Sequence, residues 1–429
     1  MPSANAITSD RWIEKSTVTM RPLELHQLRY EQGDRMLFPA DVSLRRLLAW
    51  LVEETTNYQF IDDILGLLCD RLVEAGVPVS RAALYFYTQN PEWLGARVLW
   101  EEVSGKVGVT TFDYGVETTP GYLNSPVREL VEGASIVRQK MSGSDVAELS
   151  PFFQELMEEG ASDYVAWPLV HSMGKRNAIS FATSAVGGFS EDHIAVLSGL
   201  IPTFALVSEI RVKNHIMRTL LNTYVGPHAA KQIISGATTR GSGVTVRAAV
   251  LVFDIRNFTA MSNSLPGDAV IELLNKFFDT MSEPLVGRGG EILKFMGDGF
   301  LAMIPTTEDD ACARVLDAIA DAEAAMASWN SENSGNGVPI IDYGIAVHVG
   351  DVIYGNIGTR NRLDFTVIGP AVNAAARLEE MTKSLGRRVL ISQSFVDESK
   401  LAGRFVPLGK HKLKGISEPL DLYGLGLSS

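Results

Sequence analysis

VRAAVLVFDIRNFT at Val246–Thr259 and GGEILKFMGDGFLAMI at Gly289–Ile304 each combine a run of apolar residues with a carboxylate. Asp254 follows the run AAVLVF, and Asp298 lies in the turn MGDG. Strands that end in acids at a shared sheet edge are a usual way to build an oxygen-ligand site for Mg²⁺. The first hypothesis is therefore metal-dependent chemistry on a nucleotide phosphate.

The composition indicates a globular protein with more than one domain. A chain of 429 residues is long enough for two or three domains that each bury a core. The net charge of -13 argues against nonspecific binding to nucleic acid, because such binding needs a basic surface. Cys69 and Cys312 are far apart in the sequence, which predicts two buried thiols rather than a disulfide or a metal site.

The sequence shows no obvious membrane or export signal. The longest apolar candidate, Leu197–Val207, is shorter than the roughly 18–20 residues that span a bilayer, and it contains Pro202. The first residues, MPSANAITSDRWIEK, carry early charge and no apolar core, unlike a secretory signal. We therefore expect a cytoplasmic protein without a membrane span.

The N-terminal half alternates between helical and strand-like patterns. Helical periodicity covers residues 41–57 and 60–78, and another helix is expected to begin near Ser190, where Ser-Glu-Asp favours a helix start. Four strand-like runs lie between them, at residues 81–87, 96–103, 162–171 and 177–184. The last two are expected to form an antiparallel pair joined by the polar turn MGKRN.

This order of elements resembles a GAF domain, a small-ligand sensor with a six-stranded antiparallel sheet, over about Ser43–Val212. We assign residues 41–212 to this GAF-like sensor and residues 1–40 to an N-terminal extension. The resemblance implies a small-molecule ligand. Cys69 falls in an early helix, so no covalent chromophore is expected. The alternative is a structural, dimerising module with an empty pocket.

Between the two halves, Ile210–Gly236 has apolar residues at helix-like intervals. A break is expected near Gly226-Pro227, where proline opens a new helical turn. We interpret residues 213–238 as a linker that pairs with its copy in a dimer. A plain spacer is the alternative.

Three motifs characterise the C-terminal half: FDIRNFT at Phe253–Thr259, KFMGDGFLA at Lys294–Ala302 and LDFTVIGPAVNAAARLE at Leu363–Glu379. Through them, residues 239–429 resemble the class III nucleotide cyclase catalytic domain. The resemblance implies an α+β fold with a ferredoxin-like βαββαβ core, extra hairpins, an antiparallel-rich sheet and helices on one face.

The resemblance implies that Asp254 and Asp298 bind two ions, Mg²⁺ or Mn²⁺, and that the backbone of Ile255 also faces the metal. The turn Asn257-Phe258-Thr259 would offer backbone N–H groups to a triphosphate at the start of a helix.

Further residues follow from the same resemblance. Asn373 and Arg377 are four residues apart and therefore share one helix face. By resemblance, Asn373 orients the ribose and Arg377 stabilises negative charge on the phosphates in the transition state. Lys414 takes the position of a phosphate-binding lysine, although Lys410 and Lys412 are close in sequence.

Lys294 and Thr366 occupy the two purine-reading positions. A lysine can donate to adenine N1, and a threonine hydroxyl can accept from the exocyclic amine. Many adenine-specific members have Asp where this chain has Thr366, so the chain resembles the threonine-bearing class IIIb-like subgroup. ATP is the favoured substrate, with GTP as a minor alternative because hydroxyl groups both donate and accept.

The resemblance also implies a homodimer with composite sites. One chain supplies Asp254 and Asp298, and its partner supplies Lys294, Thr366, Asn373, Arg377 and Lys414. The sequence therefore predicts an adenylate cyclase regulated by the sensor domain. The alternatives are a guanylate cyclase and a catalytically silent cyclase-like dimerisation module.

Overall fold

A computed structural model describes residues 42–141, 149–335, 338–401 and 403–426. The N-terminal extension predicted for residues 1–40 lies outside this part of the chain. The chain divides into two compact units, and the main boundary between them lies inside one long helix, after Val207. Each unit contains a sheet and helices, which confirms the predicted mixed α+β class.

The N-terminal half combines helices with the strands of the first sheet. The helices are α1 (Val42–Glu53), α2 (Ile61–Glu74), α3 (Pro120–Leu123), α4 (Pro126–Glu132), α5 (Pro151–Glu158) and α6 (Glu191–Val225), with single 3₁₀ turns at Thr55–Asn57, Val116–Thr118 and Ser172–Gly174. The strands are β1 (Arg81–Tyr87), β2 (Trp93–Glu101), β3 (Lys106–Asp113), β4 (Val137–Lys140), β5 (Asp163–Val170) and β6 (Arg176–Thr183).

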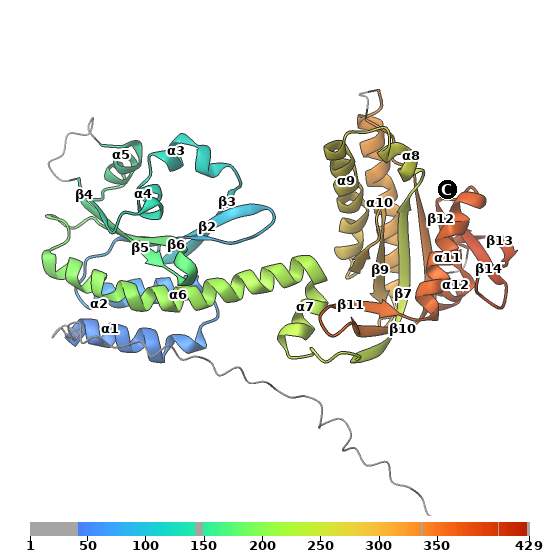
Figure 1. Cartoon of the computed structure of the whole chain (residues 1–429), viewed down its shortest axis with the longest axis horizontal. Helices are drawn as coiled ribbons and strands as arrows, with labels where there is room; N and C mark the ends of the chain where they lie inside the picture. Colours follow the sequence, from blue (N-terminus) through green and yellow to red (C-terminus); the bar gives the residue numbers. More distant parts are fainter. Residues whose placement is uncertain (1–41, 142–148, 336–337, 402, 427–429) are drawn as a thin grey trace, which may run out of the picture. The chain divides into compact units, whose positions relative to one another are not determined.

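These strands form one six-stranded sheet in the order β3-β2-β1-β6-β5-β4. Strands β5 and β6 are an antiparallel hairpin, as the sequence predicts. Figure 1 shows α1, α2 and α6 on one side of the sheet and α3, α4 and α5 on the other. The first group supplies much of the core, including Ile64, Leu68 and the buried thiol Cys69. Burial raises the pKa of Cys69, which therefore stays protonated.

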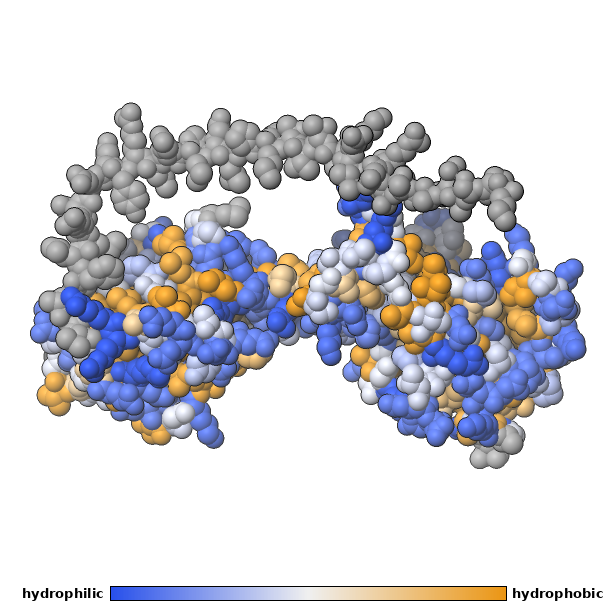
Figure 2. Space-filling view, turned by 90° about the horizontal axis from the view of Figure 1, so that it is seen from below, coloured by the Kyte–Doolittle hydropathy of each residue, from blue (hydrophilic) through white to orange (hydrophobic). Residues whose placement is uncertain are grey.

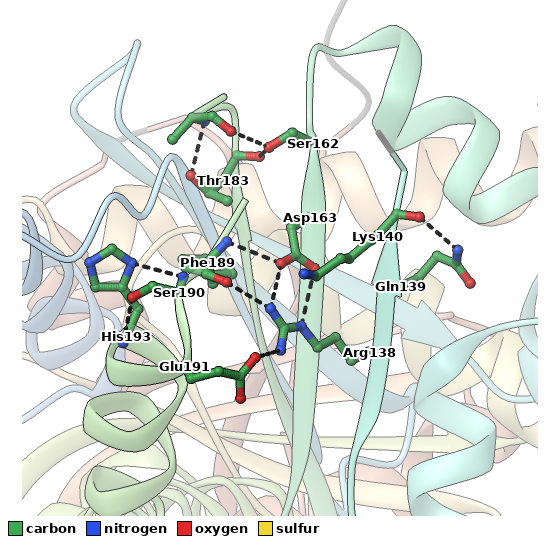
Figure 3. Close-up of polar contacts among 11 residues, drawn as sticks. Arg138, Gln139, Lys140, Ser162, Asp163, Thr183, Phe189, Ser190, Glu191 and His193 are labelled. Carbon is green, nitrogen blue, oxygen red and sulfur yellow. Dashed lines mark hydrogen bonds and ion pairs between the residues drawn. The ribbon is translucent and has the colours of Figure 1, made fainter. Parts of the chain in front are cut away.

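A buried ion pair fastens the start of α6 to this sheet (Figure 3). The Asp163 carboxylate on β5 is fully buried and accepts hydrogen bonds from Arg138 Nη2 at 3.0 Å and from the Phe189 N–H at 3.1 Å. Arg138, on β4, also donates to the Phe189 carbonyl at 2.7 Å and to Glu191 at 3.1 Å. Its guanidinium thus satisfies the buried carboxylate and holds the first turn of α6.

Helix α6 joins two stretches that the sequence predicts to be helical, the one that begins near Ser190 and the one from Ile210 to the break at Gly226-Pro227. It begins after Ser190, whose hydroxyl accepts from the His193 N–H at 3.2 Å, and it continues through Pro202 to Val225. Gly226, with φ of 87°, then ends it, and α7 (Pro227–Ile234) follows as the predicted break requires.

By length and composition alone, α6 could cross a bilayer, so the expectation that no apolar stretch is long enough does not hold for this helix. About 44% of its most apolar stretch is buried inside the protein, where Leu197, Leu200 and Phe204 are among the core residues. Other hydrophobic residues reach the surface in patches among hydrophilic ones (Figure 2). On α6 these exposed residues include Leu206, Ile210, Met217 and Tyr224.

The second unit contains α7, α8 (Phe258–Ser262), α9 (Gly267–Val286), α10 (Ala311–Glu332), α11 (Pro370–Ser384) and α12 (Gln393–Ser399). Its strands are β7 (Gly243–Ile255), β8 (Glu291–Phe295), β9 (Gly299–Pro305), β10 (Tyr343–Gly358), β11 (Leu363–Ile368), β12 (Val389–Ser392), β13 (Phe405–His411) and β14 (Leu420–Leu425).

The second sheet has the order β13-β14-β12-β10-β7-β9-β8, and β11 pairs with β10. The elements β7, α9, β8, β9, α10 and β10 follow the expected βαββαβ order. Strands β7, β9 and β8, and β7 with β10, pair antiparallel, whereas β10 and β12 are parallel. The sheet is therefore antiparallel-rich, as predicted.

The prediction that helices cover one face of this sheet is wrong. One core joins α9 and α10 to the sheet through Phe277, Ile319 and Val347. Two smaller clusters place α11 on the opposite face through Ala375 and Leu378. Figure 1 shows α9 and α10 on one side of the strands and α11 on the other. Both faces need cover because consecutive residues of β10, such as Ile345 and Ala346, are fully buried on either side.

The Asp163 ion pair predicts a stability effect. Asp163→Asn places an amide donor against the Arg138 and Phe189 donors, so we expect a loss of about 2–3 kcal/mol in the free energy of unfolding of the N-terminal unit. Urea denaturation followed by tryptophan fluorescence measures it. The matched control is Glu132→Gln in the exposed Arg128–Glu132 pair, with an expected loss below about 0.5 kcal/mol. Equal losses in the two variants would contradict this role of the buried pair.

Candidate active site

Asp254 and Asp298 adjoin each other at one end of the second sheet. Asp254 is next to the last residue of β7, where it pairs with Gly299 at the start of β9. The N–H of Ile255 donates to the backbone carbonyl of Asp298 at 3.2 Å. The turn that carries Asp298 is therefore tied directly to the end of the strand that carries Asp254.

Two glycines flank Asp254 on the neighbouring strands. A Cβ at Gly299 would lie 2.2 Å from the Phe253 carbonyl and 3.1 Å from Asp254 Oδ2. On the other side, Gly344 of β10 pairs with Asp254, and a Cβ there would lie 2.4 Å from Glu379 Oε1. Directly paired residues point to the same face of a sheet. Because Gly344 has no side chain, the Glu379 carboxylate of α11 can lie over it, on the same face of the sheet as Asp254.

Electrostatics agree with this crowding of acids. Burial raises the pKa of Asp254 to about 7, and the negative charges of Asp298 and Glu379 add to the effect. The pKa of Glu379 is also raised, mainly by burial, although a hydrogen bond from Thr382 and the charge of Arg256 oppose the shift. Glu379 is absent from the residues that the sequence pattern singled out, because its position depends on how α11 packs on β10.

Arg256 anchors the end of α11 next to these acids. Its guanidinium donates to Asp342 at 3.2 Å, to the Thr382 carbonyl at 3.2 Å and to the Arg387 carbonyl at 2.7 Å. The Thr382 carbonyl belongs to the last turn of α11 and also accepts from the Arg387 N–H at 3.0 Å. A charged donor on a helix-end carbonyl helps to fix the helix terminus. The C-terminal turn of α11 is therefore held against the strand end that carries Asp254.

The turn after β7 leads directly into a helix. Asn257 has φ of 58°, a left-handed conformation that Asn tolerates better than most residues, and Phe258 and Thr259 open α8. Lys383 Nζ of α11 lies 3.4 Å from Asn257 Oδ1. A cation therefore lies beside the turn that the sequence analysis associates with a triphosphate.

The two predicted purine-reading residues lie on different strands, Lys294 on β8 and Thr366 on β11. Lys294 Nζ is 3.8 Å from Asp364 Oδ2, and both side chains are about half exposed. Asp364 is two residues from Thr366 on the same strand, so both side chains point to one face. The structure thus brings Lys294 to the Thr366 face of β11.

Asn373 and Arg377 lie on α11, and Arg377 forms an ion pair with Glu380 of the same helix. Lys414 is exposed in the turn between β13 and β14, after the strand that contains Lys410. The residues predicted to bind the nucleotide are Lys294, Thr366, Asn373, Arg377 and Lys414. In the described part of the chain, no hydrogen bond or ion pair joins any of them to Asp254 or Asp298.

The acids fit a hard divalent cation. The Asp254 and Asp298 carboxylates and the Ile255 carbonyl are oxygen donors, and Mg²⁺ and Mn²⁺ prefer oxygen donors. Burial and the like charges of Asp298 and Glu379 raise the pKa of Asp254, and a bound cation would offset both effects. Within the described residues no group of three or more His, Cys, Asp or Glu side chains forms a complete metal site. This donor set therefore suits ions that also take water or substrate oxygens as ligands.

Comparisons with known proteins agree with the motifs. Residues 244–425 match the family model of the adenylate and guanylate cyclase catalytic domain. The chain is 33% identical to adenylate cyclase 1 of Rhizobium meliloti over 172 residues, which are 40% of this chain and 26% of that protein. It is 34% identical to an adenylate cyclase of Anabaena cylindrica over 190 residues, which are 43% of this chain and 37% of that protein.

The match covers well under half of either relative. A solved structure of a bacterial light-regulated adenylyl cyclase is similar over 53% of this chain and 64% of that chain, with 24% identity and a TM-score of 0.46. The resemblance recognised in three motifs thus extends, at the level of sequence, over nearly all of the second sheet domain.

The raised pKa of Asp254 predicts that this side chain destabilises the metal-free protein. Its pKa is about 7 in the folded chain, against 3.8 for an unperturbed aspartate, so the cost is full above pH 7 and is lost as the pH falls toward 4. Asp254→Asn should therefore stabilise the protein in EDTA by on the order of 1 kcal/mol at pH 8, after allowance for solvent screening, and by little at pH 4.5.

Thermal unfolding at both pH values measures this difference. Asp317→Asn is the matched control, because Asp317 is an exposed acid on α10, and it should produce no pH-dependent gain. A gain for Asp254→Asn that is the same at pH 8 and pH 4.5 would rule out the electrostatic cause.

Proposed function

We propose that this protein is an adenylate cyclase that converts ATP to 3′,5′-cyclic AMP and pyrophosphate. The observation that carries the proposal is the adjoining pair Asp254 and Asp298 at the end of β7, inside the segment that matches the cyclase catalytic domain. The named adenylate cyclases among the relatives support ATP as the substrate.

In this proposal Asp254, Asp298 and the backbone carbonyl of Ile255 would hold two ions, Mg²⁺ or Mn²⁺. Bound there, the ions would lower the pKa of the ribose 3′-hydroxyl and neutralise phosphate charge. The protein itself holds the acids together. The hydrogen bond from the Ile255 N–H to the Asp298 carbonyl ties the two segments, and glycine at positions 299 and 344 leaves room for the carboxylates.

Other residues bind and orient the nucleotide. The backbone N–H groups of Asn257, Phe258 and Thr259 would receive the triphosphate at the start of α8. Asn373 would orient the ribose so that its 3′-oxygen is in line with the α-phosphorus. Arg377 would stabilise the charge that develops as pyrophosphate leaves, with Lys414 on the terminal phosphates.

Base choice is assigned to Lys294 and Thr366. Lys294 would donate to adenine N1 and the Thr366 hydroxyl would accept from the exocyclic amine. This combination corresponds to the threonine-bearing, class IIIb-like subgroup. Guanylate cyclase is the second candidate, because a hydroxyl group can also donate to the guanine carbonyl.

The active form is proposed to be a homodimer with two composite sites. Within one chain no described hydrogen bond or ion pair joins the acids to Lys294, Thr366, Asn373 or Arg377, which supports supply of these residues by a second copy. A two-fold axis would then create two equivalent sites. The exposed Arg377 and Lys294 side chains are accessible to such a partner.

We further propose that the N-terminal unit is a GAF-like sensor of a small molecule and that the protein acts in the cytoplasm. The six-stranded sheet with helices on both sides supports the sensor assignment. Helix α6 runs from the sensor sheet across the boundary of the two units, so it is the continuous element available to carry a regulatory signal.

Mixing two inactive variants tests the shared site. Asp254→Ala and Arg377→Ala should each lower cyclic AMP production at least about 100-fold, because each site loses a metal ligand or a transition-state cation. After random re-pairing of an equal mixture, half of the dimers carry one intact site, so activity should recover to about a quarter of wild type.

A mixture of Asp254→Ala with Asp298→Ala is the matched control. Both substitutions affect the same half-site, so no composite site is restored. Absence of recovery in the first mixture, with heterodimers verified by differential tagging, would contradict the composite site.

A further inference from the structure

The two strands that carry the base-reading residues are not neighbours in the sheet. Strand β8, with Lys294, lies at one edge, and β7 and β9 separate it from β10. Strand β11, with Thr366, pairs only with the far half of β10, where Thr366 is opposite Gly355. Backbone pairing therefore does not set the separation of Lys294 and Thr366, and side chains must do so.

A buried hydrogen bond joins these two parts of the unit. The hydroxyl of Tyr354, on β10, donates to Glu291 Oε1, on β8, at 2.6 Å. Tyr354 is only 2% exposed, and burial raises the pKa of Glu291 despite this hydrogen bond. A short bond from a phenol to a carboxylate in a partly buried site is a strong constraint on both groups.

Each partner is close in the chain to a base-reading residue. The Tyr354 ring meets the Phe365 ring edge-on, with centroids 4.8 Å apart and planes at 87°. Phe365 immediately precedes Thr366. Glu291 is three residues before Lys294 on the same short strand. Neighbouring residues of a strand point to opposite faces, so Phe365 lies on the face of β11 opposite Thr366. Through the Tyr354 ring, the hydrogen bond therefore connects β8 to that face of β11.

Helix α7 provides a third contact. The Glu291 carboxylate also accepts from the backbone N–H of Ala229, near the start of α7. The ring of His228 lies 5.2 Å from that of Tyr354. A Cβ on Gly226 would lie 3.5 Å from Glu291 Oε1, so the helix start packs closely on this carboxylate. Glu291 therefore joins β8, β10 and α7 at one point.

We propose that Glu291 and Tyr354 are positioning residues that fix the separation of Lys294 and Thr366 and thereby set the preference for adenine over guanine. This inference rests on the proposed function of the same site. The exposed Lys294–Asp364 pair, at 3.8 Å, is too weak to hold the strands alone, because exposed ion pairs contribute little. The buried bond is the stronger link between them.

The test uses Tyr354→Phe and Glu291→Gln in the chain of 429 residues. Each removes or weakens the bond with little change in volume. We expect the KM for ATP to rise about tenfold, with kcat changed less than about threefold, and the ATP-to-GTP ratio of kcat/KM to fall about tenfold. The double variant should be no worse than the poorer single variant, because both remove one interaction.

Tyr423→Phe is the matched control. Tyr423 also donates its hydroxyl to a side chain, Gln393, but it lies on β14 near the other edge of the sheet. It should leave KM and the ATP-to-GTP ratio unchanged. A general loss of stability would change the KM for ATP and the ATP-to-GTP ratio in both tyrosine variants. A positioning role changes them only in Tyr354→Phe.

Hydrogen exchange provides a readout that does not depend on turnover. In Tyr354→Phe, the amides of residues 291–295 and 363–368 should exchange about tenfold faster, with no such change in Tyr423→Phe. Wild-type exchange rates in both segments, or an unchanged ATP-to-GTP ratio in an active enzyme, would overturn the inference. A wild-type protein that releases no cyclic nucleotide would instead contradict the proposed function, and the exchange data would still decide the positioning role.

Discussion

The close approach of the Asp254 and Asp298 carboxylates is the constraint on which the C-terminal unit depends. The Asp254 carboxylate is half-buried beside other acids, and its pKa is raised to about 7, mainly by burial and further by the charges of Asp298 and Glu379. The fold brings the two acids together through the hydrogen bond from the Ile255 N–H to the Asp298 carbonyl and through glycine at positions 299 and 344. A half-buried carboxylate with a raised pKa beside other acids is typical of a functional site.

Helix α11 links this constraint to the rest of the proposed chemistry. Its C-terminal half packs beside the acids through Glu379 and the Thr382 carbonyl that Arg256 holds. Its N-terminal half carries Asn373 and Arg377, which form no hydrogen bond or ion pair with either acid in the described part of the chain. In the proposed dimer, one rigid helix would therefore connect the metal half of one site to the phosphate-binding half of the other, so both sites would respond to the same movement.

Much of the fold follows from local patterns, and the rest depends on tertiary contacts. The sequence predicts β1, the β5–β6 hairpin and the break at Gly226-Pro227, because apolar periodicity and turn residues mark them. The βαββαβ order follows instead from the resemblance of three motifs to the cyclase catalytic domain. The sequence misses β3, an edge strand with mostly exposed residues. The sequence places Asp254 and Asp298 at strand ends, but it does not reveal Glu379 or the Tyr354–Glu291 bond. Those contacts join residues 125 and 63 positions apart through packing that no spacing encodes.

Product analysis of the purified protein with ATP or GTP, in Mg²⁺ and in Mn²⁺, tests the proposed cyclase activity most directly. We expect 3′,5′-cyclic AMP and pyrophosphate in equal amounts from ATP, a much lower yield of cyclic GMP from GTP, and neither cyclic nucleotide in EDTA. Release of ADP and phosphate, or no product from either nucleotide by a folded dimer with both metals, would contradict it.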